Sequence, residues 1–178
     1  MSKGSLYVLV EGNDDERFFN TVLKPRLLQH YRVIKFWKYA RERRRRTIKF
    51  LRALKDMEAA FIFVRDIDSA PSIGVKKREI GVCYDHMIPE SAMAIVVMEI
   101  ESWYLAGHAD KFLDEMGIWF PLPTTDTLTK EEFNRLIPVH MSRIEFMSEC
   151  LKHFAIERGV VRNASFRYFM QHWLNGEV

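Results

Sequence analysis

The stretch Leu6-Tyr7-Val8-Leu9-Val10, followed directly by Glu11-Gly12, decides how the rest of the chain is interpreted. Five consecutive apolar residues that end at an acid and a glycine predict a short strand buried on both faces. Residues 59–64 and 92–98 have the same character, and residues 31–39 alternate between apolar and polar side chains. Buried strands of this kind are typical of parallel sheets that are covered by helices.

Helices are predicted between these strands and after the last of them. Residues 15–30 carry an apolar stripe, residues 41–55 form a strongly basic segment, and residues 75–89 have no assignable pattern. The helices predicted after the fourth strand include residues 129–136, 142–157 and 165–174. The order predicts an α/β fold, a mostly parallel central sheet of about four strands flanked by helices, with a helical C-terminal extension. We expect residues 1–106 to form the α/β core and residues 107–178 to form the extension, packed on the same domain.

Composition excludes several classes of protein. The chain has 178 residues, 48% apolar and 29% charged, which excludes disordered, collagen-like and low-complexity proteins. It contains no uninterrupted apolar run long enough to span a membrane, so no membrane association is expected. Cys83 and Cys150 are far apart and lack metal-ligand spacing, which favours a reducing, cytoplasmic location.

Charge is distributed unevenly along the chain. Residues 1–57 carry 15 Lys and Arg against 6 Asp and Glu, whereas residues 58–178 carry 12 against 18. The basic half is densest within residues 41–52, which predicts contacts with a polyanion such as nucleic acid. A solvated helix face, or a patch that meets the acidic half of a second copy in a homodimer, are the alternatives. The residues predicted to bind nucleic acid are Arg41, Arg44, Arg45, Lys49 and Arg52.

Acidic residues follow three of the predicted strands. In an open α/β sheet, ligands bind outside the carboxyl ends of the strands. A spacing of two residues in extended chain places the two side chains of a pair on one face. Several carboxylates at one edge repel one another unless their pKa values rise or cations neutralise them. The acids in question are Glu11, Asp15, Asp66, Asp68, Glu99 and Glu101.

Oxygen-only ligands of this kind favour Mg²⁺ or Mn²⁺. The sequence therefore predicts a divalent-metal site, with two ions, at the carboxyl ends of the strands. The alternative is that the acids cap helices and keep the sheet edge soluble, which is our interpretation of Asp14 and Glu16.

Two motifs together resemble a TOPRIM domain, the metal-binding α/β module of topoisomerases, bacterial primases and OLD (overcoming lysogenization defect) nucleases. They are Glu11-Gly12 after the first strand and Asp66-Ile67-Asp68 after the third. Asp15, four residues after Glu11, resembles the OLD-type variant in particular. Glu99-Ile100-Glu101-Ser102-Trp103 and Asn163-Ala164-Ser165-Phe166 resemble segments of its small stand-alone relatives.

The resemblance implies a metal-dependent nuclease or a related phosphoryl-transfer protein that acts on DNA or RNA. Glu11 would be the general acid or base and a metal ligand, and Asp66 and Asp68 would be catalytic residues that bind Mg²⁺. Asp15, Glu99 and Glu101 would complete a second metal site. A role in defence against phage rests on the same resemblance.

One departure from the OLD pattern concerns ATP. The chain lacks a Gly-rich Lys-Ser/Thr loop, so any ATPase would be encoded separately and act as a partner. Two other functions stay open. A phosphoacceptor receiver domain would use Asp66 as its acceptor, and a catalytically silent accessory subunit would bind nucleic acid or the ATPase without cleaving anything.

Overall fold

The first compact unit of the chain, Met1–Ile95, is built on a four-stranded parallel sheet. The structure is a computed structural model that describes residues 3–120 and 123–174. The strands have the order β2-β1-β3-β4, so the first strand of the chain lies inside the sheet. This confirms the predicted α/β class. The bounds are β1 Lys3–Val10, β2 Tyr31–Lys38, β3 Ala60–Asp66 and β4 Met93–Val96.

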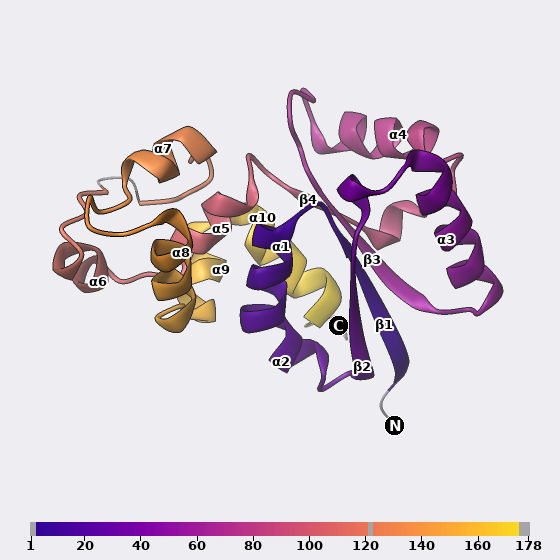
Figure 1. Cartoon of the computed structure of the whole chain (residues 1–178), viewed down its shortest axis with the longest axis horizontal. Helices are drawn as coiled ribbons and strands as arrows, with labels where there is room; N and C mark the ends of the chain where they lie inside the picture. The colour runs from indigo at the N-terminus through magenta and orange to yellow at the C-terminus, as the bar shows by residue number, and fades with distance from the viewer. Residues whose placement is uncertain (1–2, 121–122, 175–178) are drawn as a thin grey trace. The chain divides into compact units, whose positions relative to one another are not determined.

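Helices cover both faces of this sheet (Figure 1). α1 and α2 lie on one side, and α3 and α4 lie on the other. Between α3, α4 and the sheet is a core that includes Leu9, Leu51, Leu54, Phe63 and Ile80. In this unit the helices are α1 Asn13–Phe18, α2 Lys24–Leu27, α3 Arg44–Asp56 and α4 Ile73–Cys83.

Two predicted helices differ from the observed ones. The segment predicted as one helix over residues 15–30 is α1, then a π-helical turn, η1 Phe19–Leu23, then α2, which contains Pro25. The basic helix begins at Arg44, because residues 42 and 43 have extended backbone after a short 3₁₀ turn, η2 Tyr39–Arg41. Arg41 therefore lies outside the helix that carries the other predicted cations.

The second compact unit is Val96–Val178, and the regular elements described in it after β4 are all helices. It begins before the Glu99–Glu101 segment, and the boundary predicted after Ala106 stays a prediction. The segment predicted as one helix over residues 142–157 ends at Lys152, and a separate helix follows. The bounds are α5 Ile100–Ala106, α6 Asp110–Glu115, α7 Lys130–Arg135, α8 Arg143–Lys152, α9 Ile156–Arg162, α10 Ala164–Phe169 and a π-helical end, η4 Met170–Leu174.

A buried asparagine joins three parts of this second unit. Asn163 is fully buried, and its side-chain amide donates to Thr125 Oγ1 at 3.1 Å. The side-chain oxygen of Asn163, Oδ1, accepts from the Phe166 backbone N–H at 2.9 Å and from Ser165 Oγ at 2.8 Å. The same Ser165 hydroxyl accepts from the Trp103 indole at 2.8 Å. The Asn163-Ala164-Ser165 motif thus caps α10 and ties it to α5.

His108, just after α5, is also fully buried. Its Nε2 lies 3.0 Å from the Tyr104 carbonyl oxygen, and its ring stacks on Phe112 with centroids 4.4 Å apart. Because a carbonyl only accepts, Nε2 carries the hydrogen of a neutral ring. Burial lowers the pKa of His108 from 6.5 to about 4.

None of the described helices is both long and apolar enough to cross a membrane.

We expect His108 to make the free energy of unfolding depend on pH. The unfolded chain takes up a proton below the ordinary pKa of about 6.5, whereas the folded chain does not until about pH 4. The contribution is therefore complete above pH 6.5, and about 3 kcal/mol of it is lost as the pH falls to 4. Urea unfolding followed by tryptophan fluorescence should show a shallower pH dependence in His108→Phe than in the wild type.

His30→Asn is the matched control, because it removes a histidine whose side chain is exposed. If His108→Phe does not fold, the His108 ring can be titrated by NMR in the wild-type protein. A ring that gains its proton near pH 6.5 would contradict the assignment.

Candidate functional site at the strand ends

The carboxyl ends of β1 and β3 lie side by side at the point where the order of strand addition reverses. The chain passes from β1 outward to β2 and then crosses to β3 on the other side of β1. This switch point is where open α/β sheets form their ligand crevice. Glu11 follows β1 directly, and Asp66 is the last residue of β3. The fold therefore places two of the predicted catalytic residues on adjacent strand ends.

One guanidinium group joins the acids of the two strand ends. Arg65 Nη1 lies 2.6 Å from Glu11 Oε1, and Arg65 Nη2 lies 3.2 Å from Asp68 Oδ2. Arg65 is the penultimate residue of β3, so a single side chain reaches both loops. Glu11 and Asp68, which the sequence separates widely, are brought together in this way.

A second cation reaches the same place from α4. Lys76 is buried, and its ammonium group binds Asp68 Oδ2 directly. A buried lysine is uncommon without a charged partner, because removal of an ammonium group from water is costly. Asp68 supplies that partner. Glu11, Arg65, Asp66, Asp68 and Lys76 are called the strand-end cluster below.

Burial and the two cations shift the pKa values of Glu11 and Asp68 in opposite directions. Burial raises the pKa of Glu11, and the positive charge of Arg65 opposes this shift. Burial also disfavours ionisation of Asp68, but Lys76 and Arg65 outweigh it, so the pKa of Asp68 is lowered. The cluster thus contains one carboxyl group that holds its proton more readily than usual and one that holds it less readily.

The backbone at Asp68 departs from the extended geometry assumed for the Asp66-Ile67-Asp68 motif. Asp68 has φ of 49°, in the left-handed region that Asp tolerates better than most residues. The argument that a spacing of two places both side chains on one face therefore fails here. What orients Asp68 instead is its contact with Arg65 and Lys76.

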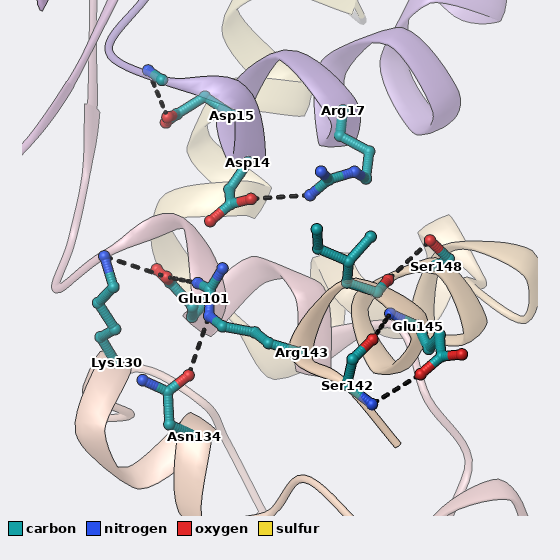
Figure 2. Close-up of polar contacts among 12 residues, drawn as sticks. Asp14, Asp15, Arg17, Glu101, Lys130, Asn134, Ser142, Arg143, Glu145 and Ser148 are labelled. Carbon is teal, nitrogen blue, oxygen red and sulfur yellow. Dashed lines mark hydrogen bonds and ion pairs between the residues drawn. The ribbon is translucent and has the colours of Figure 1, made fainter.

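Asp15 is buried at the start of α1, and one of its carboxylate oxygens accepts from the Gly12 backbone at 3.1 Å (Figure 2). Its neighbours have surface partners. Asp14 pairs with Arg17 at 2.7 Å, and Glu16 pairs with Lys38 at 2.5 Å. Asp15 thus caps α1, which is the role that the sequence analysis gave to Asp14 and Glu16.

Glu99 and Glu101 belong to the second unit, where both contact α7. Glu99 precedes α5, and its carboxylate accepts from the Lys130 backbone at 2.8 Å. Glu101 is buried, with Arg143 Nη2 at 2.5 Å and Lys130 Nζ at 3.7 Å (Figure 2). Asn134 accepts from Arg143 Nε at 3.0 Å and orients the guanidinium. Burial raises the pKa of Glu101, and Lys130 and Arg143 counteract it.

Five of the six predicted metal ligands fall into two groups: Glu11, Asp66 and Asp68 with Arg65 and Lys76, and Glu99 and Glu101 with Lys130 and Arg143. The sixth, Asp15, contacts the Gly12 backbone instead. The oxygen atoms of these ligands are chemically suited to Mg²⁺ or Mn²⁺. Within residues 3–120 and 123–174, however, no three His, Cys, Asp or Glu side chains are gathered as ligands for one metal ion. The meeting of Glu99 and Glu101 with the strand-end cluster stays a prediction.

A cavity of about 210 Å³ adjoins the strand-end cluster. Two of the residues that line it are the cluster cations, Arg65 and Lys76. The rest of the lining comes from α4 and the residue after it: Glu79, Ile80, Cys83 and Tyr84. Positive charge is thus presented to a space next to the acids.

A larger pocket, of about 720 Å³, lies along α3. It is lined by Arg44, Arg45, Ile48, Lys49, Arg52 and Asp85, and is called the basic pocket below. Four of the five residues predicted to bind nucleic acid line it. The fifth, Arg41, lies in η2 and does not.

Sequence reasoning missed the basic residues that hold the acids. Arg65 is adjacent to Asp66 in the sequence, which was a usable signal. Lys76 lies in the segment without an assignable pattern, and Arg143 is 42 residues from Glu101 along the chain. Neither gave a signal.

Comparison with known proteins adds no further assignment. No family model matches this chain, and neither does any curated protein or solved structure.

We expect Arg65→Met to destabilise the protein in a pH-dependent way. It would leave the partly buried Glu11 without its nearest cation, and would lower the free energy of unfolding by about 1–2 kcal/mol at pH 7. The loss should be smaller at pH 4, where Glu11 is protonated more readily. Urea unfolding at both pH values measures this.

Lys152→Met is the matched control, since it removes a cation from an exposed ion pair with Glu149 and should cost less than about 0.5 kcal/mol. An equal cost for the two substitutions would show that Arg65 does not stabilise Glu11.

Proposed function

We propose that the strand-end cluster catalyses divalent-metal-dependent cleavage, or a related phosphoryl transfer, on nucleic acid, as the resemblance to TOPRIM domains implies. The observation that carries the proposal is the bridge from Arg65 to Glu11 and Asp68 across the switch point of the sheet. Acids from two neighbouring strand ends meet there beside a cavity. Arrangements that perturb pKa values in such a crevice are typical of catalytic sites.

Each residue of the cluster has a role that follows from its surroundings. Glu11, whose pKa burial raises, is suited to take and return a proton as general base and acid. Glu11, Asp66 and Asp68 would supply the oxygen ligands of Mg²⁺ or Mn²⁺, which would activate water and polarise the phosphoryl group when bound. In the described residues Arg65 and Lys76 hold Glu11 and Asp68 instead, and the three acids do not gather around one ion. Arg65 and Lys76 would neutralise the non-bridging phosphate oxygens. Asp15 stays a proposed metal ligand of the first unit, and Glu99 and Glu101 stay proposed metal ligands of the second unit.

A second candidate is a catalytically silent accessory protein that binds nucleic acid or a separate ATPase. One specific observation favours it. Arg65 and Lys76 already neutralise Glu11 and Asp68, so the cluster is satisfied by the chain's own cations. Under this alternative the acids only orient the cations of the site.

We expect the wild-type protein to cleave at least one of four labelled substrates, single- or double-stranded DNA or RNA, when Mg²⁺ or Mn²⁺ is added. Glu11→Gln, Asp66→Asn and Asp68→Asn should each lower the rate by about 10²–10³-fold, because each removes a proton-transfer group or a metal ligand. The rates come from gel-resolved cleavage time courses. Asp114→Asn, an exposed acid on α6, is the matched control and should cleave at the wild-type rate.

The other outcomes identify the alternatives. Cleavage that survives Asp68→Asn would show that the cluster is not the active site. Binding without cleavage would favour the accessory protein, and labelling of Asp66 by acetyl phosphate would favour the receiver domain. Calorimetric titration with Mn²⁺ alone tests the metal site without any substrate.

A further inference from the structure

The basic pocket is built from one face of α3 and the turn that follows α4. Arg45, Lys49 and Arg52 are spaced by four and three residues, so they lie along one stripe of the helix, and all three are exposed. Between Arg45 and Arg52 the helix rises about 10 Å, which corresponds to roughly three phosphates along one strand of a duplex. The pocket thus offers a row of cations at a spacing that suits a polyanion.

Arg44 is held differently from the other cations of the pocket. Its Nε donates to the Cys83 carbonyl oxygen, and its Nη2 lies 2.7 Å from Asp85 Oδ1. Asp85 has φ of 52°, and the next residue, His86, has φ of 55°. Two consecutive left-handed residues turn the chain sharply, so that the Asp85 carboxylate borders the pocket and is its one anionic wall.

Without a bound ligand, the positive charge at the start of α3 is electrostatically unfavourable. Arg44, Arg45 and Arg46 lie in the first turn, where no acid is present and no side chain caps the helix. The positive end of the helix dipole favours anions at this position and disfavours cations. Glu42 pairs with Arg46 at 2.9 Å and Asp85 pairs with Arg44, and a bound phosphate would relieve the repulsion that remains.

The lining also distinguishes between two kinds of anionic partner. Interfaces between proteins have an apolar centre, whereas interfaces with nucleic acid are polar and strongly positive. In the basic pocket Ile48 is the apolar residue and is itself almost fully buried, while four residues are cations. Nucleic acid therefore fits this surface better than an acidic protein does.

We propose that the basic pocket binds the phosphates of a nucleic-acid backbone without a divalent ion, and that Asp85 competes with those phosphates for Arg44. The pocket and the cavity beside the strand-end cluster share the turn after α4, because Cys83 and Tyr84 line the cavity and Asp85 lines the pocket. Adjacent residues of one segment thus line the pocket and the cavity. The inference deepens the proposed function, since it names the surface that holds its substrate.

Fluorescence anisotropy with labelled single- and double-stranded DNA and RNA, in EDTA over a salt series, tests this. Lys49→Gln should weaken binding about tenfold and reduce the slope of log K against log salt by about 0.9 on duplex or 0.7 on a single strand. Arg45→Gln/Lys49→Gln/Arg52→Gln should abolish binding. Lys152→Gln, which removes the same charge in the second unit, should change little. The substrate that shows the larger salt slope and tighter binding identifies the preferred form.

Asp85→Asn should tighten binding about three- to tenfold, because it removes the anion that competes for Arg44. Its matched control is Asp56→Asn, an exposed acid at the end of α3 with the same change of net charge. Equal effects of the two substitutions would overturn the role of Asp85. Wild-type binding by the triple variant would overturn the pocket as a phosphate site.

Failure of this inference can be separated from failure of the proposed function. If the wild type binds in EDTA and the triple variant does not, this inference stands even where no divalent-dependent cleavage is found. If the triple variant instead loses self-association in analytical ultracentrifugation and binding to nucleic acid never occurs, the pocket is an interface between copies and the inference is wrong. Circular dichroism checks that the variants, all altered at exposed positions, are folded.

Discussion

The bridge formed by Arg65 is the interaction on which the candidate site depends. Without a cation between them, Glu11 and Asp68 would repel each other at the strand ends, and Glu11 would be partly buried with no opposite charge. Because the arginine comes from β3 itself, its position is fixed by the strand and not by a loop. The topology of the sheet and the chemistry of the crevice are therefore linked through one side chain.

In the second unit, too, a buried acid is paired with basic side chains. Glu101 is more deeply buried than Glu11, and two cations from different helices, Arg143 and Lys130, neutralise it. Removal of one partner from such a group costs more than the ion pair contributes, because a buried charge is left without compensation. In both units the acids thus fix the positions of basic side chains. A catalytic site and a purely binding site share this property.

The strands and the α/β class could be predicted because each strand is a short uninterrupted or alternating apolar run. The helix α4 could not, because its apolar residues are not confined to its buried face: Lys76 is buried together with Ile80, whereas Ile73 and Val82 are exposed. The π-helical turn after α1 has no sequence signal either, and it interrupted a helix predicted as continuous. For the site, the positions of Glu11, Asp66 and Asp68 at the switch point follow from strand ends alone. Their cationic partners could not be predicted, because they depend on contacts between segments that are distant in the sequence. The hydrogen bonds of Asn163 also depend on distant segments, and the sequence showed only the motif that contains this residue.

The outer position of β2 has a consequence for the behaviour of the protein at high concentration. An edge strand of eight residues is a template for addition of a strand from another molecule, and this is one route to amyloid-like association. Arg32, Lys35 and Lys38 are spread along β2, and the first two are exposed. Two such edges would bring Arg32 and Lys35 of one molecule close to those of another, and this like-charge contact disfavours pairing of the edges.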